Sequence, residues 1–169
     1  MKLAIVINGA GGVGKDTLCG FAASKYKTVN VSSVDLIKKA AEILGWDKRK
    51  DLASRKFLSD MKKLSSEYND GPTSYLLDQY RLFQNSDAEI MFMHIREGSE
   101  IKHLIEKTGP DVISLLIRRS SNKTVYGNAS DDNIENYNYD YIYNNDFSLE
   151  DAETDFTAFL ENIINERNL

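Results

Sequence analysis

The chain has 169 residues, a net charge of −5 and one cysteine; 41% of its residues are hydrophobic and 28% are charged. This length suits a single domain with a substantial core. The acidic charge excludes broad adhesion to nucleic acid, one cysteine excludes an internal disulfide, and the lack of an apolar run of about 20 residues excludes a membrane span. We therefore expect one cytoplasmic domain, monomeric or homodimeric, without nucleic-acid or membrane partners.

A glycine-rich stretch, Gly9–Thr17, follows the first predicted strand, Leu3–Ile7, and leads into a helical pattern. It matches the phosphate-binding loop (P-loop) spacing Gly-x4-Gly-Lys, with Asp16 where Ser or Thr usually stands. Such glycines let backbone N–H groups face a polyphosphate at a helix N-terminus, and Lys15 adds a mobile positive charge. The alternative is a simple strand-to-helix turn. The residues predicted to bind ATP are Gly9, Gly11, Gly12, Val13, Gly14, Lys15, Asp16 and Thr17.

Three helices are expected after the second predicted strand, Thr28–Ser32. Ser33 has the side chain of a helix N-cap, and the pattern predicts a helix over 36–44. A longer helix with mixed charge and one apolar face is expected over 48–68. A third helix is expected over 75–83.

Two continuously apolar runs, 90–93 and 112–117, are typical of buried parallel strands. A helix over 101–108 separates them. Residues 120–136 are polar and predict a loop. Alternating tyrosines over 137–143 predict a fifth strand.

Ser148 has the pattern of an N-cap for a last helix. The succession of strands and helices predicts a three-layer α/β/α P-loop NTPase fold with a five-stranded parallel sheet. We expect a core formed by 1–33 and 88–169, a helical insertion at about 34–87 and a lid-like loop at about 118–136. Ligands in such sheets bind at the carboxyl ends of the strands.

Several charged side chains fall at those strand ends. Arg96 and Arg118 each follow a buried strand, and their planar guanidinium groups suit phosphate oxygens. Of Arg118 and Arg119, one is expected to point away. Asp35 either caps the next helix or orients an acceptor, and Arg55 is either a surface residue or a ligand contact.

The residues for a metal ion are less regular. Asp16 occupies the position that usually supplies a hydroxyl to Mg²⁺, so its carboxylate would bind the ion, lie near the acceptor, or only complement the helix dipole. The Thr17 hydroxyl lies one residue later. His94 stands where P-loop enzymes usually place a carboxylate, and we expect a partly buried structural histidine. Cys19 is expected to be buried and His103 to lie on the surface.

Together these motifs resemble the phage and bacterial deoxynucleoside monophosphate kinases that have a Gly-Lys-Asp-Thr loop. The similarity runs in order along nearly the whole chain. Two departures are His94 in place of the family's aspartate and Leu36 in place of its proline. The matching stretches are Gly14–Thr17, Asp35–Lys38, Gly45–Asp47, Arg55 with Leu58 and Leu64, Ile95-Arg96 with Glu100, Ile117-Arg118, Ser130-Asp131 and Asp140–Glu150.

The resemblance implies a kinase that uses ATP and Mg²⁺ to phosphorylate a (deoxy)nucleoside monophosphate, with 34–87 as the acceptor-binding insertion. Two alternatives stay open: another small phosphorylated acceptor, such as phosphomevalonate or dephospho-coenzyme A, and a nucleotide-binding module that has lost catalysis. The implied catalytic residues are Lys15, Asp16, Arg96 and Arg118; the implied acceptor contacts are Asp35, Lys38, Arg55 and Arg96; the implied metal ligands are Asp16 and Thr17.

Overall fold

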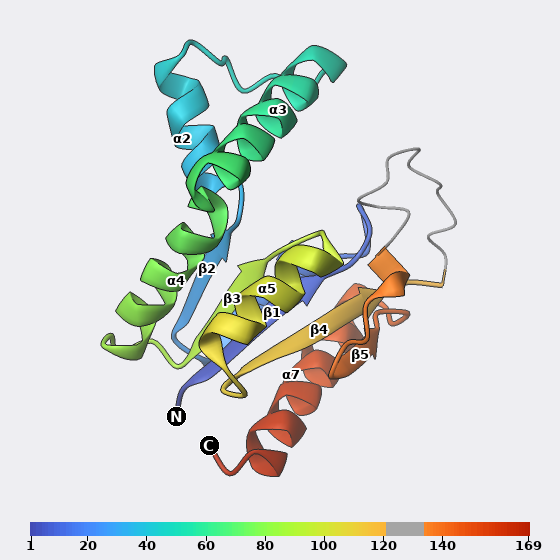
Figure 1. Cartoon of the computed structure of the whole chain (residues 1–169). Coiled ribbons are helices and arrows are strands. Elements are labelled where there is room, and N and C mark those ends of the chain that lie inside the picture. The colour runs from blue at the N-terminus through green and yellow to red at the C-terminus, as the bar shows by residue number, and fades with distance from the viewer. Residues whose placement is uncertain (121–133) are drawn as a thin grey trace.

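A computed structural model describes residues 1–120 and 134–169 of the chain (Figure 1). Its centre is a five-stranded sheet in the order β2-β3-β1-β4-β5, and every neighbouring pair is parallel. The predicted fold class, a parallel α/β sheet covered by helices, is therefore confirmed. The strands are β1 (Leu3–Asn8), β2 (Thr28–Ser32), β3 (Ile90–His94), β4 (Val112–Arg118) and β5 (Tyr141–Asn144).

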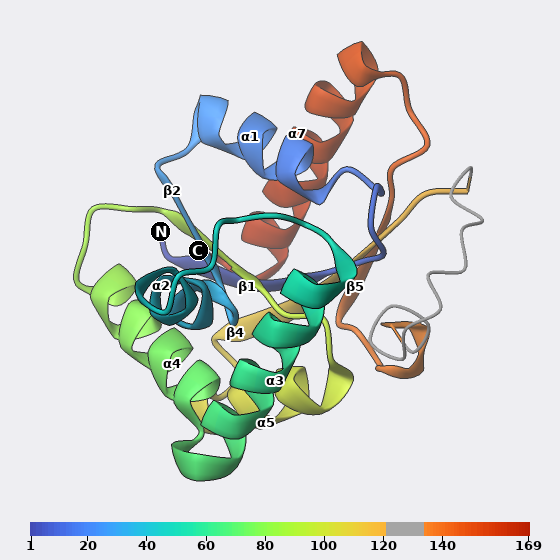
Figure 2. The ribbon, with the colours of Figure 1, turned by 90° about the horizontal axis from the view of Figure 1, so that it is seen from above.

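Helices cover both faces of the sheet. Seen from above, α1 and α7 lie on one face and α4 and α5 on the other, while α2 and α3 extend beyond the carboxyl ends of the strands (Figures 1 and 2). None of the helices in the described ranges has both the length and the apolar composition needed to cross a bilayer. The helices are α1 (Lys15–Lys25), α2 (Asp35–Ile43), α3 (Leu52–Asn69), α4 (Gly71–Gln84), α5 (Gly98–Thr108), the 3-10 helix η1 (Ile134–Asn136) and α7 (Leu149–Glu166).

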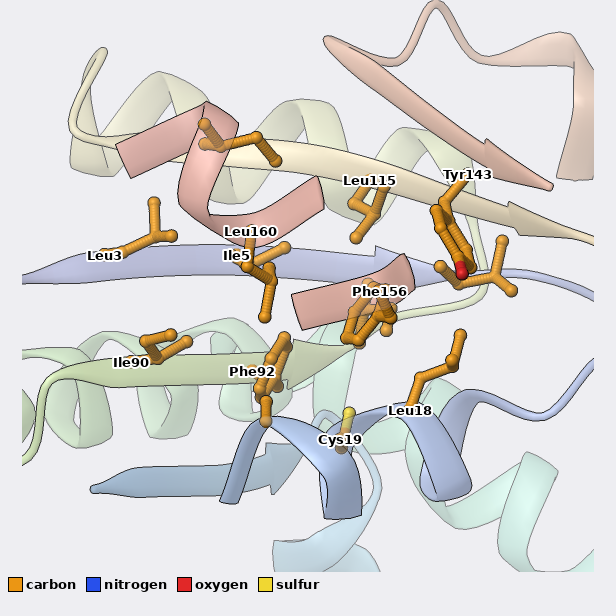
Figure 3. Packing of buried hydrophobic residues seen from close by; sticks show 14 of the residues in the cluster. Leu3, Ile5, Leu18, Cys19, Ile90, Phe92, Leu115, Tyr143, Phe156 and Leu160 are labelled. Carbon is orange, nitrogen blue, oxygen red and sulfur yellow. The ribbon is translucent and has the colours of Figure 1, made fainter. Parts of the chain in front are cut away.

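The alternating faces of the buried strands build two cores. On one face, Ile5, Phe92 and Leu115 pack with Leu18 of α1 and Phe156 of α7 (Figure 3). The other face of the same strands packs against α4 and α5, with Val6, Met91, Leu76 and Leu104 among its buried residues. Because β1, β3 and β4 are buried on both faces, their sequences are continuously apolar.

The register brings the carboxyl ends of the central strands together. Ile7 of β1 pairs with His94 of β3, and Asn8 pairs with Leu116 of β4. The glycine-rich loop that follows Asn8 therefore lies between the segments that leave β3 and β4.

Several local predictions were wrong. The N-cap of α2 is Val34 rather than Ser33, and it makes no side-chain cap bond. The helix expected from 48 begins only at Leu52, after Asp51, whose carboxylate accepts a hydrogen bond from Ser54 N.

The apolar face expected on this helix is not a core face. Leu52 is 83% exposed, Leu64 is 66% exposed, and no residue of α3 is buried. The helix extends past the sheet, so its apolar side chains have little core to cover. The fifth strand begins at Tyr141, four residues later than the tyrosine pattern indicated. Residues 121–133 of the expected lid-like loop, Ser130-Asp131 included, lie outside the described residues.

Candidate functional site

Three glycines determine the backbone path of the loop between β1 and α1. Gly9, Gly12 and Gly14 have φ angles of 146°, 80° and 92°, which L side chains rarely adopt. A Cβ atom on Gly9 would lie 2.5 Å from the carbonyl oxygen of Ile117. Gly14 is the N-cap of α1 and has no side chain to occupy the first-turn amides. The loop therefore presents the N-terminus of α1, a position suited to an anion.

The ammonium group of Lys15 folds back over this loop. Its Nζ donates hydrogen bonds to the carbonyl oxygens of Gly9 and Ala10, the latter at 2.9 Å. The side chain is half-buried, whereas Asp16 and Thr17 beside it are exposed. A positive charge and the helix N-terminus thus converge on one small region.

Two buried asparagines attach the loop to the rest of the sheet. Asn8 is 1% exposed; its Oδ1 accepts from Gly9 N at 2.8 Å, and its Nδ2 donates to the carbonyl of Arg96 at 2.9 Å. Asn145 is 6% exposed; its Nδ2 donates to the carbonyl of Val13 at 2.8 Å, and its N–H to that of Arg118 at the same distance. These bonds fix the loop between the ends of β3 and β4.

Arg96 and Arg118 therefore flank the loop from opposite sides. Both side chains are exposed. Arg118 donates through Nε and Nη2 to the carboxylate of Glu135, in a forked ion pair. This pair raises the pKa of Arg118. The Glu135 carboxylate thus occupies one edge of this guanidinium group. Hydrogen bonds from Ser120 lower the pKa of Asp146, and the charge of Arg119 makes a smaller contribution in the same direction.

His94 is the last residue of β3 and is partly buried, as expected. Its Nε2 is 3.3 Å from Asn30 Oδ1 and 4.0 Å from the sulfur of Cys19. Burial lowers the pKa of His94, which favours the neutral imidazole. Burial, with the charge of Asp16, raises the pKa of Cys19 to about 12, so this thiol is an inert core group.

The donor atoms near the loop suit a hard cation. Asp16 offers a carboxylate and Thr17 a hydroxyl, both exposed at the start of α1. Within 1–120 and 134–169, no three His, Cys, Asp or Glu side chains converge on a point. One carboxylate with a hydroxyl fits Mg²⁺, which keeps several waters and binds largely through substrate phosphates.

The acceptor residues predicted from the sequence are spread over two helices. The carboxylate of Asp35 accepts a hydrogen bond from Ser32 N at 2.7 Å and so closes the turn before α2. Lys38 is half-buried one turn later, and Arg55 is exposed in the first turn of α3. The structure brings Arg96 and Arg118 to the loop. Besides burial, the charges of Asp35 and Lys38 on α2 act on the pKa of His94 together with those of Asp16 and Lys15, whereas Arg55 lies on α3.

Sequence reasoning missed a polar cavity between α3, α4 and α5. It has a volume of about 490 Å³ and contains the pair Lys62–Glu100. His103, expected on the surface, is half-exposed here, and its Nε2 lies 2.7 Å from Asp70. Glu100 was noted only as part of the family resemblance. Charged residues on helices are usually solvated, so nothing but the resemblance distinguished Glu100 from its neighbours.

The comparisons with known proteins bear on the fold. No family model matches the chain, and no curated protein matches it. Among solved structures, TT1252 from Thermus thermophilus aligns over 95% of this chain and 97% of its own, with a TM-score of 0.54 and 17% identity. An unliganded sugar kinase from Janibacter sp. HTCC2649 aligns over 95% of both chains, with a TM-score of 0.51 and 14% identity. Both identities are below 25%, so these likenesses show that the chain shares its fold with these two structures.

Proposed function

We propose that the protein is an ATP-dependent phosphotransferase that phosphorylates a (deoxy)nucleoside monophosphate to the diphosphate. The observation that carries the proposal is the loop Gly9–Thr17, which has three glycines at positive φ and leads into a helix N-terminus. The ammonium of Lys15 folds over the carbonyls of Gly9 and Ala10. Hydrogen bonds to the backbone of Arg96 and Arg118 hold the loop between the ends of β3 and β4. Phosphoryl transfer demands this combination of positioning and positive charge.

The reaction would use the residues as follows. An oxygen of the acceptor phosphate forms a bond to the γ-phosphorus as the bond from that phosphorus to the β-bridging oxygen breaks, and ADP leaves. Lys15 and the loop amides hold the β- and γ-phosphates and stabilise the charge that develops on them. Arg118 approaches from β4, and Arg96 from β3 draws the acceptor phosphate into line.

Mg²⁺ would be held by Asp16 and Thr17 together with the nucleotide phosphates. When bound, it neutralises phosphate charge and orients the β- and γ-oxygens. His94 is not a candidate ligand, because its imidazole is partly buried against Cys19 and Asn30 and is a poor partner for this hard cation.

A coupled assay tests the proposal directly. ADP production is measured with ATP, Mg²⁺ and a panel of ribo- and deoxyribonucleoside monophosphates. The panel also contains phosphomevalonate, dephospho-coenzyme A and a simple sugar, since one structural neighbour is named as a sugar kinase. We expect turnover with at least one nucleoside monophosphate. ATP binding by calorimetry with no turnover of any acceptor would instead identify a nucleotide-binding module without catalysis.

Lys15→Ala tests the donor site. We expect at least a 100-fold loss of kcat with the fold intact, because the lysine acts on transition-state charge and contributes little packing. Lys102→Ala is the matched control, since Lys102 is an exposed lysine on α5 whose one ion pair, with Glu106, is 3.9 Å long. Circular dichroism checks the fold. Equal activity of Lys15→Ala and Lys102→Ala would remove the donor assignment.

A further inference from the structure

The cavity between α3, α4 and α5 has the size of a ligand pocket. Its volume is about 490 Å³, within the range of roughly 300 to 1,000 Å³ typical of small-molecule sites. One wall comes from α3, one from the start of α5, and the corner between α3 and α4 closes one end. None of the acceptor residues predicted from the sequence lines it.

The cavity adjoins the glycine-rich loop Gly9–Thr17, which we call the donor loop, through the segment that follows β3. Glu97 lines it and directly follows Arg96, whose carbonyl accepts a hydrogen bond from Asn8 at 2.9 Å. Asn8 in turn binds the N–H of Gly9. A ligand in the cavity would therefore have one end near Arg96 and the glycine loop.

The α3 wall belongs to one polar helix face that continues past the cavity toward the N-terminus of α3. Arg55, Ser59, Lys62 and Ser66 recur every three or four residues and so share one helix face, and the last three line the cavity. Arg55 is in the first turn of α3, at the end of the helix that stands away from the carboxyl edge of the sheet (Figure 1). The rise from Arg55 to Lys62 is roughly 10 Å, which is the scale of a nucleotide from its phosphate to its base.

The charge of the lining decides which end of a nucleotide enters. Carboxylates outnumber lysines, and Asp70, whose pKa is lowered to about 2 by hydrogen bonds that outweigh burial, is ionised at neutral pH. A phosphate would be repelled from this lining and attracted to Arg55 and Arg96. The lysines are Lys62 and Lys63, and the carboxylates are Glu67, Asp70, Glu97 and Glu100.

The most enclosed ion pair in the cavity is Lys62–Glu100. The two side chains are 14% and 22% exposed, and Nζ lies 2.6 Å from Oε1 and 2.8 Å from Oε2. An ammonium group has three donors and a carboxylate has about four acceptor positions. After the ion pair forms, Lys62 therefore still has donors, and Glu100 still has acceptor positions, that a ligand can use. The pair therefore presents donors and acceptors side by side to a flat polar ring.

We propose that this cavity receives the base of the acceptor nucleotide and that the Lys62–Glu100 pair selects guanine. This inference rests on the proposed function. Guanine has two adjacent N–H donors, N1–H and the N2 amino group, that match both oxygens of Glu100, and beside them an O6 acceptor that matches Lys62. Thymine and uracil would turn a carbonyl toward the carboxylate, and adenine and cytosine a ring-nitrogen lone pair, so each would meet repulsion.

The experiment compares kcat/KM for GMP and dGMP with the values for the A, C, U and T monophosphates, in wild type and in Glu100→Gln. We expect wild type to prefer guanine. We expect Glu100→Gln to lose about 10-fold to 100-fold with guanine, as for the loss of one bidentate pair, and to change little with the other bases. Glu106→Gln, an exposed carboxylate on the same helix, should retain wild-type values.

The two proposals fail in different ways. Phosphorylation of another base with guanine disfavoured, or an equal loss for every base in Glu100→Gln, would overturn the guanine assignment alone. Absence of turnover with all monophosphates would overturn the proposed function and this inference with it. ATP affinity and the unfolding midpoint, measured for each variant, show whether Glu100→Gln still folds, and Glu100→Asp provides a second variant that keeps the charge.

Discussion

At the scale of single residues, the donor loop depends on positions that accept only glycine. Gly14 has a φ of 92°, and a Cβ atom there would lie 2.5 Å from the side-chain nitrogen of Asn145. That nitrogen is the one that holds the carbonyl of Val13. A side chain at Gly14 would therefore strain the backbone and displace the group that fixes the loop.

We predict that Gly14→Ala weakens ATP binding at least 10-fold and lowers the free energy of unfolding by about 1–2 kcal/mol, the cost of a left-handed non-glycine residue. Gly20→Ala, inside the helix that Gly14 caps, is a matched control. Gly20 has a helical backbone with no other heavy atom within 4 Å of its added Cβ, so alanine there should stabilise the protein by about 0.5–1 kcal/mol. ATP titration and urea unfolding measure both. Unchanged ATP affinity in Gly14→Ala would contradict the role of this loop.

Another residue-scale feature is the carboxylate that occupies Arg118. The forked pair with Glu135 is partly exposed, at 43% and 56%, so it contributes at most about 1 kcal/mol. In the proposed reaction, a nucleotide phosphate that takes the same Nε–Nη2 edge of Arg118 must displace Glu135. The pair would then compete with the substrate at low cost.

We predict that Glu135→Gln lowers the KM for ATP by about 2-fold to 5-fold, since up to about 1 kcal/mol of competition is removed. The effect should shrink as salt is added, because screening weakens an exposed pair. Glu106→Gln serves as the control carboxylate. A KM that rises in Glu135→Gln would mean that Glu135 positions Arg118 for ATP instead of withholding it.

At the scale of elements, one side chain joins the α3–α4 corner to α5. Asp70 has a φ of 55°, and its Oδ2 lies 2.7 Å from both His103 Nε2 and Lys107 Nζ. Burial raises its pKa, but hydrogen bonds from Lys107, Thr73 and His103 outweigh burial and lower it to about 2. A carboxyl whose pKa falls on folding stabilises the folded state above its unfolded pKa of about 4.

We predict that Asp70→Asn destabilises the protein by about 1–2 kcal/mol at pH 7, a value reduced for the partial exposure of the site. The difference from wild type should diminish as the pH falls from about 4 to 2, where the wild-type carboxyl takes up its proton. Asparagine tolerates the positive φ, so the backbone is preserved. Urea unfolding at pH 7 and pH 3 tests this, with Asp60→Asn on the exposed face of α3 as control. An equal difference at both pH values would contradict the electrostatic origin.

At the scale of the whole molecule, the sequence was sufficient for the number of strands and their parallel direction, but it did not predict their order in the sheet. The strands β1, β3 and β4 are buried on both faces, so their uninterrupted apolar runs predicted both their position and their parallel direction. The helix α3 shows the limit of the same reasoning. Its apolar residues follow a helical repeat but lie beyond the sheet, where there is no core, and periodicity does not report what a face packs against.

The sequence predicted the motif of the site, but it did not predict which charged side chains form ion pairs. The glycines and Lys15 carry a signal in their spacing, whereas Lys62 with Glu100 and Arg118 with Glu135 become partners only through the arrangement of separate elements. The roles of Asp35, Lys38, Arg55, Arg96 and Arg118 and the assignment of 34–87 as an acceptor-binding insertion stay predictions.

The bond from Asn145 to Val13 has a consequence for how the protein is made. Its two partners are 132 residues apart, and Asn145 follows the last strand to join the sheet. During synthesis, the loop emerges before Asn145 and lacks this hydrogen bond until the chain as far as Asn145 has left the ribosome. The loop therefore gains its attachment to Asn145 only after all five strands of the described sheet have been synthesised.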